Sequence, residues 1–151
     1  MDQLTRDRIR HIFLSPRPSF AFITAATLLG LDLGDLKRRI EDGEIVAVST
    51  PLGRRVGREE MMAEAMQRWG LAAIGEALGA DAAAVLPEAI RLVELRARVP
   101  RYQRDMLRYF ARRDRKSVDE VLARELDDLA SAHAEELTGA MPGFRAALAW
   151  P

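Results

Sequence analysis

The stretch that most constrains the fold runs from residue 22 to residue 66, because helix-like and strand-like patterns follow one another there with clear turn signals. Gly30 suits the end of one helix, and Asp32 suits the N-cap of the next. An apolar, β-branched run, a Pro-Leu-Gly turn and an Arg-rich return then indicate a hairpin. In chain order, these signals predict helices at 25–29 and 33–43, strands at 45–48 and 54–56, and a helix at 59–69.

Charge is segregated along the chain although the formal net charge of its 151 residues is zero. Residues 1–58 carry ten basic and seven acidic side chains, and residues 91–116 carry ten and three. The segments 59–90 and 117–137 are acidic, with net charges of −5 and −6. Because local basic segments attract phosphates, overall neutrality does not exclude nucleic acid as a partner.

Composition excludes several classes of protein. The chain has no cysteine, so it has neither disulfides nor Cys-ligated zinc. No apolar run approaches the roughly 20 residues that span a bilayer, and the charged N-terminus does not resemble a signal peptide. We therefore expect a cytoplasmic protein without a membrane partner. The only histidines, His11 and His133, are far apart, and no phosphate loop or catalytic motif is present, so we expect no enzyme, metal or cofactor.

The pattern at 25–66 resembles the excisionase/MerR-type winged helix-turn-helix. In that family an Ala-x-Leu-Leu-Gly-Val-Ser turn leads into a recognition helix that ends in Glu-Gly-Glu-Ile or similar. This chain has Ala-Ala-Thr-Leu-Leu-Gly-Leu-Asp at 25–32, a helix at 36–43, and then Glu44 and Ile45. The wing of the family carries Gly-Arg-Arg and its next helix opens with Arg-Glu-Glu, which match 53–55 and 58–60. The resemblance covers about a third of the chain.

This resemblance implies a DNA-binding surface. A recognition helix reads base edges, and a wing reaches the backbone or the adjacent minor groove. The residues that would make these contacts are Lys37, Arg38, Arg39, Arg54 and Arg55. The recognition helix opens with Asp32, Gly34 and Asp35, where the family offers Ser, Thr, Arg or Lys, and carboxylates repel phosphate. The alternative is a helix-turn-helix that serves only as a packing module.

Residues 93–129 resemble a ribbon-helix-helix subunit. Residues 93–99 alternate apolar and charged side chains, Pro100 ends the run, and a helix is predicted at 101–112. Ser117 then caps a longer helix, with Glu120 at the capping-box position. The departure from the family is Arg115, which stands where the family usually has Gly.

In that family two chains pair their strands into one antiparallel ribbon that enters the major groove. Mapped onto this chain, Arg96 and Arg98 would face the bases, together with Glu94, and Ser117 would clamp a phosphate at a helix N-terminus. The competing interpretation is a single helix over 87–98, because Leu86, Ile90, Val93 and Ala97 also fit helical spacing.

The sequence thus predicts a mainly α fold with a small β component. Residues 1–69 would form a winged helix-turn-helix with an N-terminal helix, and residues 70–151 a helical or ribbon-helix-helix dimerisation domain with a C-terminal tail. The leading functional hypothesis is a sequence-specific transcriptional regulator that binds double-stranded DNA as a homodimer. The alternative is an antitoxin or adaptor whose acidic helix at 117–137 and tail at 141–151 bind a toxin or another partner protein.

Overall fold

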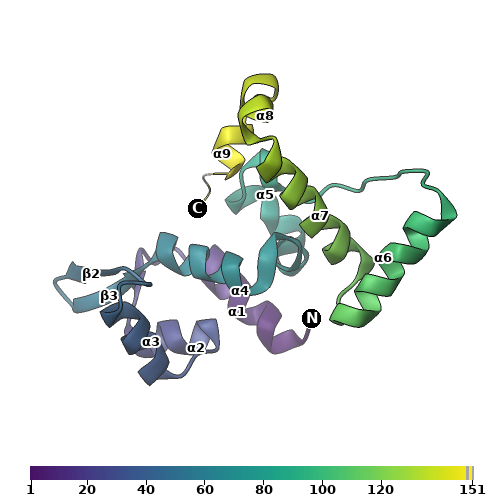
Figure 1. Ribbon diagram of the computed structural model, residues 1–151. Helices are drawn as coiled ribbons and strands as arrows, with labels where there is room; N and C mark the ends of the chain where they lie inside the picture. The colour runs from purple at the N-terminus through teal and green to yellow at the C-terminus, as the bar shows by residue number, and fades with distance from the viewer. Residues whose placement is uncertain (149, 151) are drawn as a thin grey trace. The chain divides into compact units, whose positions relative to one another are not determined.

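The computed structural model describes residues 1–148 and 150, and the chain is mainly α with a small antiparallel sheet (Figure 1). It divides into two compact units, Met1–Arg91 and Leu92–Trp150. We expected a boundary after residue 69. The boundary lies later because the helix that begins at Arg58 continues to Leu78, where Arg10 of the N-terminal helix donates to its last carbonyls.

The N-terminal unit contains the elements that the sequence pattern predicts, together with a short additional strand. In order they are α1 (Gln3–Leu14), β1 (Ser19–Phe20), α2 (Phe22–Leu29), α3 (Leu33–Glu41), β2 (Ala47–Thr50), β3 (Gly53–Gly57) and α4 (Arg58–Leu78). Short helical turns follow at η1 (Gly79–Asp81), α5 (Ala82–Val85) and η2 (Glu88–Ile90).

Local chemistry sets the end of α2 and the start of α3. Gly30 adopts a left-handed conformation with φ of 65°, which ends α2 at little steric cost. The Asp32 carboxylate accepts a hydrogen bond from the Gly34 backbone N–H at 2.7 Å and caps α3. Both roles confirm the sequence prediction, so the tight turn between α2 and α3 follows from the sequence around Gly30 and Asp32.

The strands form a sheet in the order β1-β3-β2, with both pairs antiparallel. Thr50 pairs with Gly53, so Pro51 and Leu52 alone form the loop of the β2–β3 hairpin. On the other side of β3, Phe20 pairs with Val56, and both side chains are buried. The pairing through Phe20 attaches the base of the hairpin to the core.

The N-terminal helix α1 is part of this core. Ile9, Ile12 and Phe13 are fully buried. From the same helix, Arg10 donates to the carbonyl oxygens of Ala77 at 3.3 Å and Leu78 at 3.1 Å, at the C-terminal end of α4. These are the carbonyls that a helix end leaves without partners, so α1 caps α4 as well as packing on it.

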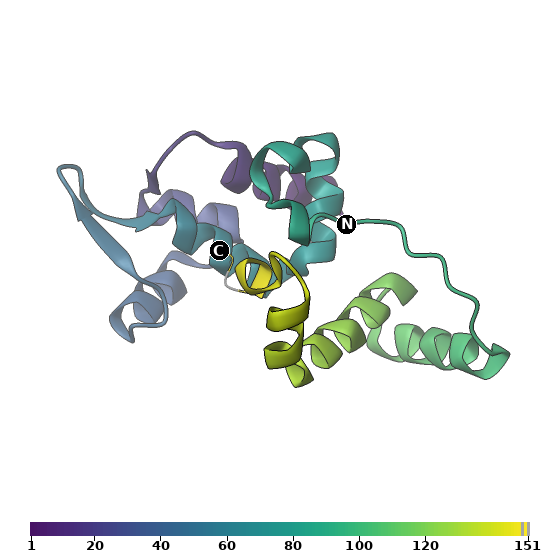
Figure 2. The ribbon, with the colours of Figure 1, turned by 90° about the horizontal axis from the view of Figure 1, so that it is seen from above.

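Helix α4 contains a kink at Gly70, whose φ of 75° is not helical. A glycine reaches this conformation readily, whereas a residue with a Cβ is strained there. We expected a helix to residue 69, and the kink separates that segment from a second one, which buries Ile74 and Leu78 in the core. Helix α4 lies beside α1 in both ribbon views (Figure 2).

The C-terminal unit starts with residues 92–100, which are extended and form neither helix nor strand. The predicted helix over 87–98 is wrong. Pro87 leads into the single turn η2, and Arg91 is extended, with φ of −70° and ψ of 142°. Arg91 also donates to the backbone carbonyls of Leu86 at 2.9 Å and Ala83 at 3.0 Å, which draws its side chain back over α5. The ribbon at residues 93–99 stays a prediction, because its backbone hydrogen bonds would be formed with the same residues of a second chain.

Helices make up the rest of the C-terminal unit: α6 (Arg101–Asp114), α7 (Val118–Ala132), α8 (Ala134–Ala140) and α9 (Phe144–Leu148). The predicted capping box at the start of α7 is confirmed, because the Ser117 hydroxyl accepts from the Glu120 N–H and the Glu120 carboxylate accepts from the Ser117 N–H. Between α6 and α7, Arg115 has a φ of 54°, in the left-handed region that favours glycine.

Over residues 1–148 and 150, the structure contains no helix long and apolar enough to cross a bilayer.

Candidate nucleic-acid interface

Helix α3 presents two basic side chains to solvent. Leu36 and Ile40 are buried against the rest of the N-terminal unit, which fixes the rotation of the helix. Lys37 and Arg38 therefore lie on its exposed side. The Arg38 guanidinium remains 68% exposed although it lies 3.0 Å from the Asp35 carboxylate. An exposed pair of this kind contributes little to stability, so Arg38 can exchange this partner for a phosphate.

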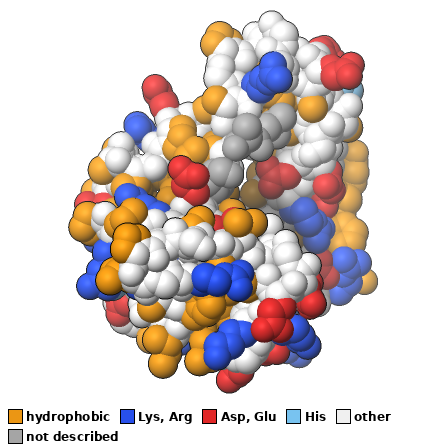
Figure 3. Space-filling model, turned by 90° about the vertical axis from the view of Figure 1, so that its left-hand side faces the viewer, with side chains coloured by type: hydrophobic (Ala, Val, Ile, Leu, Met, Phe, Trp, Pro, Cys, Tyr) orange, Lys and Arg blue, Asp and Glu red, His pale blue; other side chains and the backbone are white. Residues whose placement is uncertain are grey.

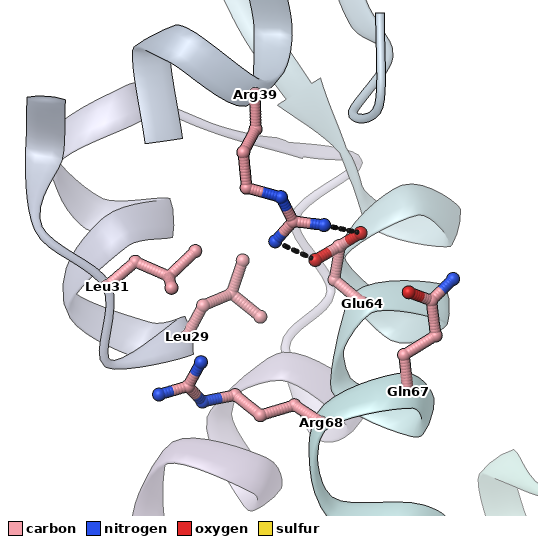
Figure 4. A pocket seen from close by; sticks show the side chains of 6 residues that line it. All are labelled: Leu29, Leu31, Arg39, Glu64, Gln67 and Arg68. Carbon is pink, nitrogen blue, oxygen red and sulfur yellow. Dashed lines mark hydrogen bonds and ion pairs between the residues drawn. The ribbon is translucent and has the colours of Figure 1, made fainter. Parts of the chain in front are cut away.

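Arg39, the third basic residue of α3, points inward. Its Nη1 and Nη2 donate to the two carboxylate oxygens of Glu64 at 2.7 and 3.0 Å (Figure 4). Its Nε donates to Glu44 at 2.9 Å. Glu64, on α4, is only 6% exposed. Hydrogen bonds to Glu64 and then to Glu44 raise the pKa of Arg39 above its ordinary value. The sequence prediction assigned Arg39 to DNA, whereas this geometry commits it to holding α3 on α4.

A pocket of about 200 Å³ lies beside this ion pair. Its lining residues come from the end of α2, the α2–α3 turn, α3 and α4: Leu29, Leu31, Arg39, Glu64, Gln67 and Arg68 (Figure 4). Arg68 donates to the Gly30 carbonyl at 3.2 Å, so a second arginine bridges α4 to the turn. The pocket is thus bordered by two contacts that fix α3 and the α2–α3 turn to α4.

The two arginines of the β2–β3 hairpin differ in the same way. Arg54, next to the hairpin loop, is exposed, and the structure gives no hydrogen bond or ion pair for its side chain among the described residues. Arg55 is half-buried and donates to the hydroxyl of Ser19 at 3.0 Å and to its carbonyl at 3.2 Å. Arg55 therefore fastens β3 to β1, and Arg54 is the arginine that can reach a partner.

The carboxylates at the start of α3 are both engaged within the chain. Asp32 caps the helix and Asp35 pairs with Arg38. On the side of the molecule shown in Figure 3, basic and apolar side chains lie next to one another with acidic ones among them. The exposed cations of the N-terminal unit that this site offers are Lys37, Arg38, which pairs only with the exposed Asp35, and Arg54.

The second set of predicted contacts lies in the C-terminal unit. Arg96 forms an exposed pair with Glu94 at 3.1 Å, and Arg98 is exposed in the same extended segment. The backbone N–H of Ser117 already donates to the Glu120 carboxylate at 2.6 Å, so a phosphate there would have to displace Glu120. Of the residues assigned to a ribbon, only Arg96 and Arg98 remain available to DNA without disrupting a helix cap.

The C-terminal unit, which the sequence assigns to dimerisation or partner binding, carries an extensive exposed apolar surface. In the described part of this unit, Ala111 and Val121 are the only buried apolar side chains. Large apolar side chains on α6 and α7 face solvent instead: Tyr102, Met106, Tyr109, Val118, Leu126 and Leu129. The signal was in the sequence, because these residues recur at helical spacing and exceed what one helix pair can cover. Of the expected tail surface at 141–151, residues 149 and 151 lie outside the described residues.

The comparisons with known proteins add no assignment. No protein-family model, no curated protein and no solved structure among those searched matches the chain. Among the residues that the structure describes, no group of three or more His, Asp or Glu side chains could hold a metal ion.

Proposed function

We propose that this protein is a transcriptional regulator that binds double-stranded DNA as a homodimer. The observation that carries this proposal is the N-terminal unit, in which a short helix pair and a hairpin leave Lys37, Arg38 and Arg54 exposed while Arg39 and Arg55 serve the fold. A helix with exposed cations beside a two-stranded wing suits the major groove and its neighbouring backbone. Such a regulator would act in the cytoplasm.

The exposed apolar faces of α6 and α7 support the dimer. A unit with so few buried apolar side chains cannot offset the entropy of folding through its own core. A second copy would cover Leu126 and Leu129, and it could also pair with residues 93–99 as the ribbon prediction requires. This arrangement would place two N-terminal units on one DNA site, which favours a palindromic sequence.

The decisive experiment is binding of the purified full chain to fluorescent duplexes from the DNA upstream of its own gene. It should be run at two salt concentrations with excess nonspecific competitor, together with light scattering for mass. We expect a dimer whose binding survives competitor and weakens steeply with salt. Binding that competitor abolishes would contradict sequence-specific recognition, and a monomer that binds equally well would contradict the dimer.

The same apolar faces favour a second candidate function, that of an antitoxin or adaptor. Here α7 would receive a different protein in place of a second copy, and the helix-turn-helix would be mainly structural. Val118, Leu126 and Leu129, all exposed on α7, would be covered by that protein. A monomeric chain without specific DNA binding, which forms a stable complex with the product of a neighbouring gene, would favour this candidate over the regulator.

A further inference from the structure

The tip of the β2–β3 hairpin carries an exposed apolar side chain. Leu52 is 82% exposed, and Pro51 beside it is also exposed. The loop consists of these two residues alone, because Thr50 pairs with Gly53. Burial in the chain's own core therefore does not explain an apolar residue here, and at a hairpin loop polar residues or glycine are the usual choice.

The tip is also held in shape. The Thr50 hydroxyl donates to the Gly53 carbonyl at 2.8 Å and accepts from the Leu52 backbone N–H at 3.2 Å. Gly53 supplies the positive φ of 93° that the turn requires, and Pro51 has a fixed φ of its own. Leu52 is thus presented on a preorganised loop, which lowers the entropic cost of inserting it into a partner.

The charge around the tip indicates an anionic partner. Residues 45–57, which include the whole hairpin, contain two arginines and no aspartate or glutamate. Arg54 is exposed next to the loop, on the strand that leaves it. The partner should therefore present negative charge at its rim and an apolar interior to Leu52.

We infer that Leu52 is a wedge that enters the minor groove and partly unstacks one base step, so that the protein bends the DNA it binds. This inference rests on the proposed DNA binding and goes beyond it, because neither base reading nor phosphate contact requires a kink. Leucine and proline are among the side chains that unstack base steps, with kinks of about 20–90°. Arg54 would then hold the phosphates beside the widened groove.

Duplex DNA suits the tip better than an anionic membrane does. Lys37 and Arg38 belong to the same compact unit as the hairpin, on a helix separated from it by a few residues. A lipid surface would engage Leu52 but would make no use of a helix-turn-helix. Vesicle binding is therefore the competing outcome that the experiment must include.

The test uses the full chain and two short duplexes from the upstream DNA that the proposed regulator binds, each labelled with a fluorophore at each end, one intact and one kinked beforehand by an adenine bulge. Because the kink no longer has to be formed, we expect the chain to bind the bulged duplex about tenfold more tightly. We also expect energy transfer between the ends of the intact duplex to rise on binding. In Leu52→Ser both the preference and the rise should be lost, while affinity for the intact duplex changes less than about twofold.

Val48→Ser is the matched control, because Val48 is an exposed apolar residue of the same hairpin away from the loop. It should bend DNA as the unchanged chain does. Binding of the intact duplex without any change in energy transfer would overturn the wedge and leave the proposed function standing. No binding to either duplex would overturn both, and Leu52-dependent binding to phosphatidylglycerol vesicles instead of DNA would assign the tip to a membrane.

Discussion

Arg39 and Glu64 form a two-pronged ion pair between α3 and α4, with nitrogen–oxygen distances of 2.7 and 3.0 Å. The carboxylate is buried while the guanidinium is partly exposed, so the two partners are desolvated to different extents. This pair fixes the angle at which α3 presents Lys37 and Arg38. Stability and the proposed DNA contact are therefore separable on adjacent residues of one helix.

Arg39→Ala should lower the free energy of unfolding by about 3 kcal/mol, because Glu64 would be left as a buried charge without a partner. Urea denaturation followed by circular dichroism measures this loss. Glu44→Ala removes the exposed partner of the same arginine and should cost less than about 1 kcal/mol. Equal losses in the two variants would show that burial of Glu64 is not what makes the pair important.

Replacing Lys37 and Arg38 together by alanine should weaken DNA binding while leaving the unfolding transition unchanged. If each contacts one phosphate, the slope of log affinity against log salt should decrease by about 2. Fluorescence anisotropy over a salt series gives this slope. Arg145→Ala, an exposed arginine of the C-terminal unit, is the control and should leave affinity and slope as they are. An unchanged slope in the double variant would remove α3 from the interface.

Leu126→Glu combined with Leu129→Glu should convert the dimer into a monomer, since the substitutions bury charge in the proposed interface. Light scattering at several concentrations measures the mass. Ser131→Glu adds a charge to an exposed position of α7 as well and should leave the mass unchanged. A dimer that survives both leucine substitutions would move the dimer contact away from this face of α7.

The α7 capping box should make the helix sensitive to acid. Hydrogen bonds from the backbone N–H and then the hydroxyl of Ser117 lower the pKa of Glu120. A carboxylate whose pKa is lower in the folded state stabilises it above the ordinary value of about 4.3, and this stabilisation is lost as pH falls through the lowered value.

Glu120→Gln keeps a capping-box side chain but cannot titrate, so it should flatten this part of the acid transition followed by circular dichroism. Asp127 acts in the opposite direction, because burial and then Asp128 raise its pKa. The comparison of the Gln variant with the unchanged chain isolates Glu120 from that effect. Identical acid transitions in the two proteins would contradict the role of the capping box.

Arg115→Gly should raise stability or leave it unchanged. Glycine adopts the φ of 54° at little steric cost, and this relief of strain at least offsets the greater conformational entropy that glycine gives the unfolded chain. Arg112→Gly, inside α6, should lower stability by about 1 kcal/mol, since the same substitution there only weakens the helix. Thermal unfolding of the two variants provides the measurement. Destabilisation of equal size at both positions would indicate that the Arg115 side chain makes a contact that outweighs its backbone strain.

Features set by neighbouring residues could be predicted from the sequence. The end of α2 at Gly30, the cap at Asp32 and the Ser117–Glu120 box each depend on a few adjacent positions, and all three are confirmed. Strand β1 was missed, because Phe20 becomes a strand residue only through its pairing with Val56. Residues 93–99 fit the period of a strand and that of a helix equally well. The helix is not formed because the chain is extended at Arg91, a conformation that no local sequence pattern predicts.

The candidate site was predictable in part. Lys37 and Arg38 are exposed because the burial of Leu36 and Ile40 fixes the rotation of α3. Arg39 lies three residues after Leu36 and therefore on the same side of the helix as these two buried residues. Helical spacing could therefore have separated Arg39 from its neighbours, and Glu64 in the buried row of α4 between Met61 and Ala65 was the matching signal. The role of Arg55 could not be foreseen, because Ser19 lies on the strand that the sequence did not reveal.

Helix α1 lies before the stretch 22–66, whose pattern resembles a winged helix-turn-helix. It nevertheless supplies Ile9, Ile12 and Phe13 to the core and caps α4 through Arg10. From α4, Arg58 donates in turn to the Phe13 carbonyl at 2.6 Å. The stretch 22–66 that looks like a portable module is consequently smaller than the compact unit 1–91 whose core it shares. Grafting that stretch alone into another protein would transfer its contact residues without the scaffold that orients them, whereas a graft of residues 1–91 would carry both.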